Sequence, residues 1–233
     1  MRAPLVLAVD TPDLDTAQRW IEATQDYVSV YKLGLEFFLT FGHEGVTRIQ
    51  GVTDADIFLD LKLHDIPHTV GAAASAVQSL KPRFLTVHAS GGRAMINAAV
   101  KALPSTDVTA VTVLTSLSEE DIFEIGFANN ALESAVSLAK MSITAGARAI
   151  VCSPLEIEAI RSAIGVDPHI ITPGVRPAAS QGGDDQKRTM TPQAAIAAGA
   201  SYVVIGRPIT QAWAQGAKAM TAAARAIAED ILQ

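Results

Sequence analysis

The sequence is poor in cysteine and in aromatic residues. Among 233 residues it has one cysteine, Cys152, and phenylalanine, tryptophan and tyrosine together make up 5%. A lone cysteine excludes an internal disulfide bond and is typical of a reducing compartment. Because Cys152 directly follows the apolar residues 149–151, we expect its thiol to be packed in the core and not to act as a nucleophile.

Clustered positive charge and long hydrophobic segments are also missing. The chain has 18 Lys and Arg against 24 Asp and Glu, so it lacks the basic surface that binding along nucleic acid requires. No run approaches the ~18 apolar residues of a membrane span. The apolar run 5–9 is too short for the hydrophobic region of a signal peptide. We therefore expect a cytoplasmic protein that binds neither nucleic acid nor a membrane.

Eight short apolar runs, rich in β-branched residues, recur along the chain. They lie at residues 5–10, 27–32, 57–62, 84–88, 108–114, 147–153, 169–172 and 202–206. Most are continuous and not alternating, as expected for parallel strands that are covered on both faces. Alanine-rich segments with helical periodicity lie between them, such as the apolar stripe formed by Leu132, Val136, Ala139 and Ile143.

Eight strand–helix pairs in 233 residues predict an α/β fold of the (β/α)8 TIM-barrel type, whose typical length is about 250 residues. An open doubly wound sheet is the alternative, but its first strand is normally followed by a glycine-rich turn. Here Asp10-Thr11-Pro12-Asp13 stands in that place. Composition does not change along the chain, so we expect residues 1–233 to form a single domain.

A few helix boundaries are marked in the sequence. Ser118 followed by Asp121 predicts a capped helix start, and Ser153 before Pro154 predicts another. Gly165 falls where the preceding helix should stop.

Charged residues follow the first three predicted strands. Asp10 ends the first strand, Lys32 the second, and Asp60 and Lys62 the third, with Asp65 just beyond. Active sites of such barrels lie at the carboxyl ends of the strands. Because residues 60 and 62 differ by two, we expect both side chains to leave the same face of an extended strand, toward the barrel interior. Five ionisable groups so placed favour a catalytic centre over a charge network that only fills the barrel mouth.

Glycine and arginine follow the last two predicted strands. The seventh strand leads into Pro173-Gly174-Val175-Arg176, and the eighth leads into Gly206-Arg207-Pro208 and directly into a helix. Backbone N–H groups at glycine, a helix N-terminus and an arginine each favour a bound anion. Gly-Arg-Pro alone also fits an ordinary helix start. Together the two segments predict a phosphate site, since the loops after strands seven and eight recurrently bind phosphate in such barrels.

The histidines are weaker candidates for functional residues. His64 and His68 lie four residues apart, as metal ligands on a helix do, but Pro67 lies between them and no third ligand is evident. We therefore predict no metal site. His88, at the end of the fourth strand, is a candidate for contact with the site, but a hydrogen-bonded core histidine is the favoured interpretation.

These segments closely resemble one family. Residues 60–67, Asp-Leu-Lys-Leu-His-Asp-Ile-Pro, are similar to the signature of the orotidine 5'-phosphate decarboxylases. The likeness extends over the chain, which resembles the bacterial form of the enzyme. Its further segments are residues 8–10, 31–34, 114–116, 172–177, 185–188 and 206–208.

The resemblance implies a homodimer that converts orotidine 5'-monophosphate into uridine 5'-monophosphate and CO2, the last step of de novo UMP synthesis, without a metal or organic cofactor. It makes Lys62 the donor of a proton to C6 and places Asp60 beside the departing carboxylate. Lys32 and Asp10 would hold the ribose and the charge network. Asp65 would serve the partner's site, so that the active sites are shared.

The same resemblance assigns the rest of the substrate site. Thr115 and Ser116 would lie near the pyrimidine ring, and Thr69, like Asp65, would reach into the partner's site. The remaining implied substrate-binding residues are Ile66, Pro173, Arg176, Gln186, Gly206 and Arg207. Four of these, Arg176, Gln186, Gly206 and Arg207, would hold the phosphate.

Chemistry supports this interpretation of the charged residues. Loss of CO2 at C6 leaves a carbanion with no obvious delocalising group, which a preorganised ammonium such as Lys62 can stabilise and then protonate. We expect the polar segment 178–188 to be a lid that closes over the phosphate.

Two other functions remain open at this point. Metal-dependent 3-keto-gulonate-phosphate decarboxylases and hexulose-phosphate synthases resemble this chain in an Asp-x-Lys-x-x-Asp pattern, and Glu36 is a possible carboxylate ligand for their Mg2+. A catalytically silent phosphate-binding protein is the other alternative. The segments His-Asp-Ile-Pro and Leu-Thr-Ser favour the nucleotide enzyme.

Overall fold

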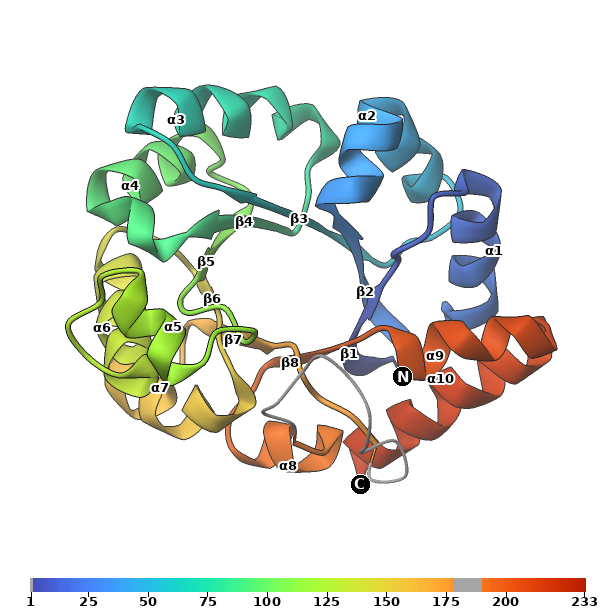
Figure 1. The fold of residues 1–233 in the computed structure, drawn as a ribbon. Helices are drawn as coiled ribbons and strands as arrows, with labels where there is room; N and C mark the ends of the chain where they lie inside the picture. The colour runs from blue at the N-terminus through green and yellow to red at the C-terminus, as the bar shows by residue number, and fades with distance from the viewer. Residues whose placement is uncertain (1, 178–189) are drawn as a thin grey trace.

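Eight parallel strands form a closed barrel in the order of the chain, with β8 pairing back onto β1 (Figure 1). The structure, a computed structural model, describes residues 2–177 and 190–233. The closed ring confirms the predicted (β/α)8 barrel, and the alternative of an open doubly wound sheet is wrong. The strands are β1 (Ala3–Ala8), β2 (Val28–Gly34), β3 (Asp56–Leu63), β4 (Phe84–His88), β5 (Asp107–Val111), β6 (Ala149–Val151), β7 (His169–Thr172) and β8 (Tyr202–Ile205).

Helices surround the barrel as an outer ring (Figure 1). The α-helices are α1 (Leu14–Thr24), α2 (Leu35–Gln50), α3 (Pro67–Ala76), α4 (Gly92–Ala102), α5 (Glu119–Glu124), α6 (Ala131–Thr144), α7 (Ile157–Ile164), α8 (Pro192–Ala197), α9 (Arg207–Thr210) and α10 (Ala217–Leu232). Short 3-10 helices are η1 (Gln78–Leu80), η2 (Ala89–Gly91), η3 (Pro154–Glu156) and η5 (Gln211–Gln215). Within the described parts of the chain, no helix combines the length and apolar character needed to cross a membrane.

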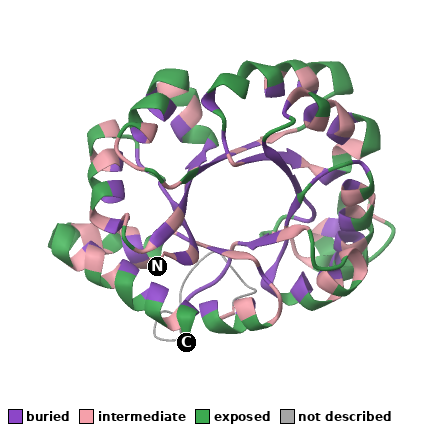
Figure 2. Cartoon of the chain, turned by 180° about the vertical axis from the view of Figure 1, so that it is seen from behind, coloured by how far each residue is buried: buried purple, intermediate pink, exposed green. Residues whose placement is uncertain are grey.

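The strands are buried on both faces, as their continuous apolar runs predict (Figure 2). One face packs against the helices and forms the larger part of the core, with residues such as Leu5, Leu7 and Leu33. The other face fills the barrel interior. The buried residues of this inner cluster are Val6, Val30, Phe58, Phe84, Ala149 and Ile171.

Strand boundaries match the predictions to different degrees. β4 and β7 have the predicted ends, whereas β1 stops at Ala8 before Asp10, and β5 stops at Val111 before Leu114. Val9 and Val113, just past those ends, are still buried. An apolar run therefore continues from the strand into a buried loop, and hydrophobicity alone does not mark where pairing stops.

The predicted helix starts and stop are present. Ser118 and Asp121 form a reciprocal capping box at the start of α5. Ser153 precedes a proline that opens η3, which leads into α7. Gly165 ends α7 with a φ of 81°, a left-handed conformation that favours glycine.

Candidate active site

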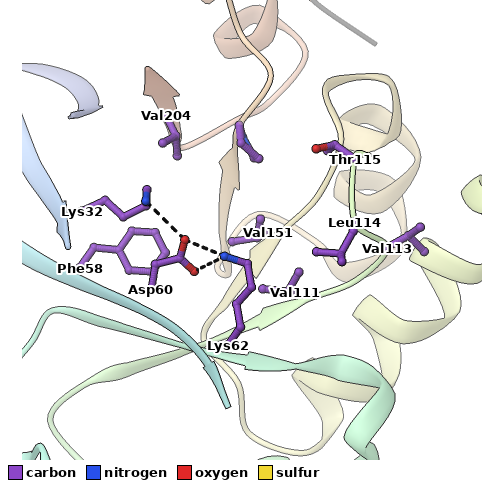
Figure 3. Close-up of a pocket in the computed structure, with 11 residues that line it drawn as sticks. Lys32, Phe58, Asp60, Lys62, Val111, Val113, Leu114, Thr115, Val151 and Val204 are labelled. Atoms are coloured by element: carbon purple, nitrogen blue, oxygen red, sulfur yellow. Dashed lines mark hydrogen bonds and ion pairs between the residues drawn. The ribbon is translucent and has the colours of Figure 1, made fainter. Parts of the chain in front are cut away.

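Four charged side chains, from β2, β3 and the loop after β1, meet at one end of the barrel. The ammonium of Lys62 donates hydrogen bonds to both carboxylate oxygens of Asp60, at 2.7 and 2.8 Å (Figure 3). Lys32 Nζ lies 3.5 Å from Asp60 Oδ2 and 3.5 Å from Asp10 Oδ1. The result is an alternating row, Asp10–Lys32–Asp60–Lys62, in which each charge has an opposite neighbour.

Asp60 is the most strongly affected member of this row, because it is buried between two lysines. The side chains of Asp60 and Lys32 are each 13% exposed, and that of Lys62 is 37% exposed. Burial raises the pKa of the Asp60 carboxyl, but Lys32, Lys62 and a hydrogen bond from Thr86 lower it by more, so the pKa lies below its ordinary value. Asp60 is therefore ionised at neutral pH and holds the Lys62 ammonium in a fixed place.

The backbone at Lys62 differs from the extended strand that we predicted. Its φ is 49°, and the register between β3 and β4 shifts between Leu59 and Leu63. The strand predicted through residue 62 is present, since β3 continues to Leu63, but its extended backbone is interrupted at Lys62. A bulge re-aims the side chain, and the ammonium still reaches Asp60 because the lysine chain is long. Such left-handed backbone is rare in residues other than glycine and is found at functional sites.

A largely apolar cavity of about 190 Å3 opens beside the Asp60–Lys62 pair (Figure 3). Most of its wall is aliphatic or aromatic, and its polar groups are the three charged residues and Thr115. A flat ring with one reacting atom facing the pair would suit such a wall. Its lining residues are Lys32, Phe58, Asp60, Lys62, Val111, Val113, Leu114, Thr115, Val151, Pro173 and Val204.

A second, more polar cavity of about 200 Å3 adjoins the first and shares Lys32, Pro173 and Val204 with it. It carries two arginines: Arg176, which is buried, and Arg207, which begins α9. This combination of guanidinium groups and glycine backbone suits a phosphate. The other lining residues are Ala8, Asp10, Gly174, Val175, Gly206 and Pro208.

Several residues implied by the resemblance lie away from both cavities. Asp65, Ile66, Thr69 and Ser116 are exposed and line neither cavity. Asp65 accepts a hydrogen bond from the backbone N–H of Ile66, at 2.6 Å. Gln186 and the predicted lid, residues 178–188, lie outside the described residues.

The histidines and the cysteine take no direct part in the row of charges. The His88 ring lies against that of His64, with centroids 5.3 Å apart. Burial, His64 and Lys62 lower the pKa of His88, and Asp60 opposes them. Cys152 is buried, which raises the pKa of its thiol.

Carboxylates are sparse around the two cavities. Within residues 2–177 and 190–233 no group of three or more His, Cys, Asp or Glu side chains suited to a metal ion occurs. Glu36, considered as a possible ligand, is exposed in the first turn of α2 and lines neither cavity.

The sequence did not single out Thr86 or the apolar wall of the first cavity. Thr86 lies in β4 and hydrogen-bonds both Asp60 and the backbone of Lys62. A hydroxyl within the apolar run 84–88 was the available signal, since a buried polar group needs partners. Val111, Val151 and Val204 gave no signal, because they look like any other core residues.

Comparison with known proteins places the chain in a family. Residues 3–223 match the family model described as orotidine 5'-phosphate decarboxylase / HUMPS family. An orotidine 5'-phosphate decarboxylase of Thermobifida fusca is 50% identical over 96% of this chain and 96% of that protein. One of Frankia casuarinae is 46% identical over 97% of this chain and 87% of that protein.

A solved structure is similar in both fold and sequence. The crystal structure of orotidine 5'-phosphate decarboxylase from Lactobacillus acidophilus has a TM-score of 0.83 and 34% identity, covering 99% of this chain and 100% of that one. The family model spans the strand ends that carry both cavities. The chain therefore belongs to the orotidine 5'-phosphate decarboxylase / HUMPS family.

Proposed function

We propose that this protein decarboxylates orotidine 5'-monophosphate to uridine 5'-monophosphate and CO2. The observation that carries the proposal is the Asp60–Lys62 pair, which faces an apolar cavity beside a cavity with two arginines. Relatives named orotidine 5'-phosphate decarboxylase support it, among them one that is 50% identical over 96% of this chain. The whole chain then acts as one catalytic domain, in the cytoplasm.

Each cavity would bind a different part of the nucleotide. In the proposed complex Arg176, Arg207 and Gly206 hold the phosphate in the more polar cavity. The ribose lies where the cavities meet, at Lys32 and Asp10. The pyrimidine ring enters the apolar cavity beside Pro173 and Thr115, so that its C6 faces Lys62. Ser116 follows Thr115 in the chain, outside the cavity lining.

Lys62 is the proposed proton donor. The bond between C6 and the carboxylate breaks, its electron pair stays on C6, and CO2 leaves. A proton from Lys62 Nζ then forms the new C6–H bond, and the amine regains its proton from solvent. Because Asp60 holds the ammonium at 2.7 Å, the positive charge is already in place where negative charge develops.

The surroundings of the pair favour the product side. Asp60 remains ionised, since its pKa is lowered, and it would repel a substrate carboxylate placed beside it. Val111, Val151 and Phe58 face the same space, and apolar side chains suit neutral CO2 better than a carboxylate. Binding energy from the distant phosphate offsets the cost of holding the carboxylate there.

We further propose a homodimer with shared active sites. Asp65, Ile66 and Thr69 follow the catalytic strand yet are exposed, and Ile66 is 64% exposed. An exposed isoleucine between polar residues suits contact with a second copy. Each site would then combine Asp60 and Lys62 of one subunit with Asp65 of the other.

One assay separates this function from the alternatives. The absorbance of orotidine 5'-monophosphate is followed with purified protein in excess EDTA, and turnover is the expected result because Lys62 supplies the positive charge. Turnover that needs Mg2+ would instead favour the metal-dependent relatives. No turnover under either condition would favour a phosphate-binding protein without catalysis.

A further inference from the structure

We infer that Thr86 is a positioning residue that sets the geometry of the Asp60–Lys62 pair. The inference rests on the proposed decarboxylase function, in which that pair does the chemistry. Thr86 lies in the middle of β4 and is fully buried. It lines neither cavity, so it acts through the pair and not on the substrate.

A single hydroxyl joins both members of the pair. Thr86 Oγ1 lies 2.9 Å from Asp60 Oδ1 and 2.8 Å from the backbone nitrogen of Lys62. The backbone N–H is only a donor and the ionised carboxylate only an acceptor, so the direction of each bond is determined. The hydroxyl accepts from Lys62 and donates to Asp60, which leaves it one orientation.

The bulge in β3 explains why a side chain is needed here. Leu59 pairs with Leu85 and Leu63 pairs with Val87. Three residues of β3, namely 60–62, therefore lie opposite one residue of β4, Thr86. Regular ladder pairing is interrupted over this stretch, and the Thr86 hydroxyl gives the Lys62 N–H an acceptor.

This contact supports an unfavourable backbone conformation. Lys62 has a φ of 49°, which persists in a non-glycine residue only where its surroundings hold it. The same hydroxyl prevents Asp60 from rotating, because Oδ1 is held by Thr86 and by the Lys62 ammonium at once. Thr86 thus ties the carboxylate and the backbone of its lysine partner to the neighbouring strand.

Two substitutions at residue 86 separate the hydroxyl from the volume of the side chain. Thr86→Val keeps the shape and removes both hydrogen bonds, whereas Thr86→Ser keeps the hydroxyl. For Thr86→Val we expect kcat for orotidine 5'-monophosphate to fall about 10- to 100-fold, the effect of losing a hydrogen bond to a charged group. We expect KM to change less than about threefold, because the phosphate contacts are elsewhere. Thr86→Ser should restore most of kcat.

Thr109→Val is the matched control. Thr109 is the residue of β5 that pairs with Thr86, and it is also fully buried. Its hydroxyl donates to the carbonyl of Asp107 in its own strand, so its loss should leave kcat unchanged. Thr86→Ala, which adds no methyl group against Asp60, repeats the test should Thr86→Val fail to fold.

A second measurement does not depend on activity. Hydrogen exchange of the Lys62 amide, followed by NMR at neutral pH, should be at least about tenfold faster in Thr86→Val and unchanged in Thr86→Ser and Thr109→Val, because only Thr86→Val removes the acceptor. The inference would be overturned if Thr86→Val kept both the kcat and the Lys62 amide exchange rate of the parental protein. It would also be overturned if kcat fell as far in Thr86→Ser as in Thr86→Val. Should the parental protein itself show no turnover, the proposed function fails, and the exchange measurement still decides the role of Thr86.

Discussion

Lys62 combines three properties that different parts of the molecule supply. Its ammonium is held by Asp60, its backbone has a left-handed conformation, and its side chain borders the apolar cavity. A charge in this position acts on a reacting atom without first having to reorganise. The lysine should therefore matter far more to kcat than to substrate binding.

Replacing Lys62 by alanine should reduce kcat by at least about 10⁴-fold, because both the proposed proton donor and its positive charge are lost. Affinity for uridine 5'-monophosphate should change little, since Arg176 and Arg207 remain. Steady-state kinetics and calorimetric titration of the nucleotide measure the two effects. Lys101→Ala, at an exposed position of α4, is the control; a Lys62→Ala variant with a near-normal rate would contradict the assignment of the proton donor.

At the scale of elements, the amino ends of the strands carry a second charged cluster. Asp107 opens β5 and its side chain is 4% exposed. Its carboxylate lies 3.0 Å from Arg83 Nη1, 3.4 Å from Arg148 Nε and 3.8 Å from His169 Nε2. These contacts join the start of β5 to the starts of β4, β6 and β7. Residues at the amino-terminal end of such a barrel usually contribute to stability and not to catalysis.

Replacing Asp107 by asparagine should lower the free energy of unfolding by about 3 kcal/mol, because a buried charge pair is broken. Urea unfolding measures the loss, and kcat should stay at the parental value. Asp56→Asn is the matched control: the Asp56 side chain is 53% exposed and 4.0 Å from Arg83, and such pairs contribute under about 1 kcal/mol. Equal losses in the two variants would refute the role of burial.

For the whole molecule, two histidines link stability to pH. Burial lowers the pKa of His169, as do Arg83 and Arg161, while Asp107 opposes them. Burial lowers the pKa of His88 as well. The unfolded chain therefore binds more protons than the folded one at mildly acidic pH. The two histidines make their full contribution to stability above about pH 6.5, the pKa of histidine in the unfolded chain. This contribution is lost as the pH falls from there to the lowered pKa values that the two side chains have in the folded protein.

His169→Gln should accordingly weaken the loss of stability between pH 7 and pH 5, because one of the two linked groups is removed. Urea unfolding at a series of pH values gives the slope. His43→Gln, at an exposed position of α2, is the control. An unchanged slope in His169→Gln would show that this side chain does not couple stability to pH.

The proposed shared site makes a prediction at the scale of the dimer. Lys62→Ala and Asp65→Ala homodimers should each be nearly inactive, because every site lacks one residue. Refolding an equal mixture of the two should restore roughly a quarter of the parental activity, since half of the dimers are hybrids and each hybrid has one complete site. Mixing without any gain in activity would contradict the assignment of Asp65 to the neighbouring site.

The sequence by itself determined the positions of the strands and of the charged residues near their ends. The apolar runs predicted all eight strands, because strands covered on both faces must be apolar throughout. Asp10, Lys32, Asp60 and Lys62 stood out because charge is rare where a buried strand ends. The predicted runs extended past the ends of β1 and β5, since buried loops can be as apolar as the strands that they follow.

Tertiary structure decided how those residues meet. Closing the barrel pairs β8 with β1, which brings Arg207 to the same cavity as Asp10 and Lys32. The shift of register between β3 and β4 gives Lys62 its left-handed backbone and brings Thr86 against the Asp60–Lys62 pair. Both depend on the packing of strands that are distant in sequence. Spacing along the chain therefore located Asp60 and Lys62, whereas the pairing of β3 with β4 determined how the two side chains are held.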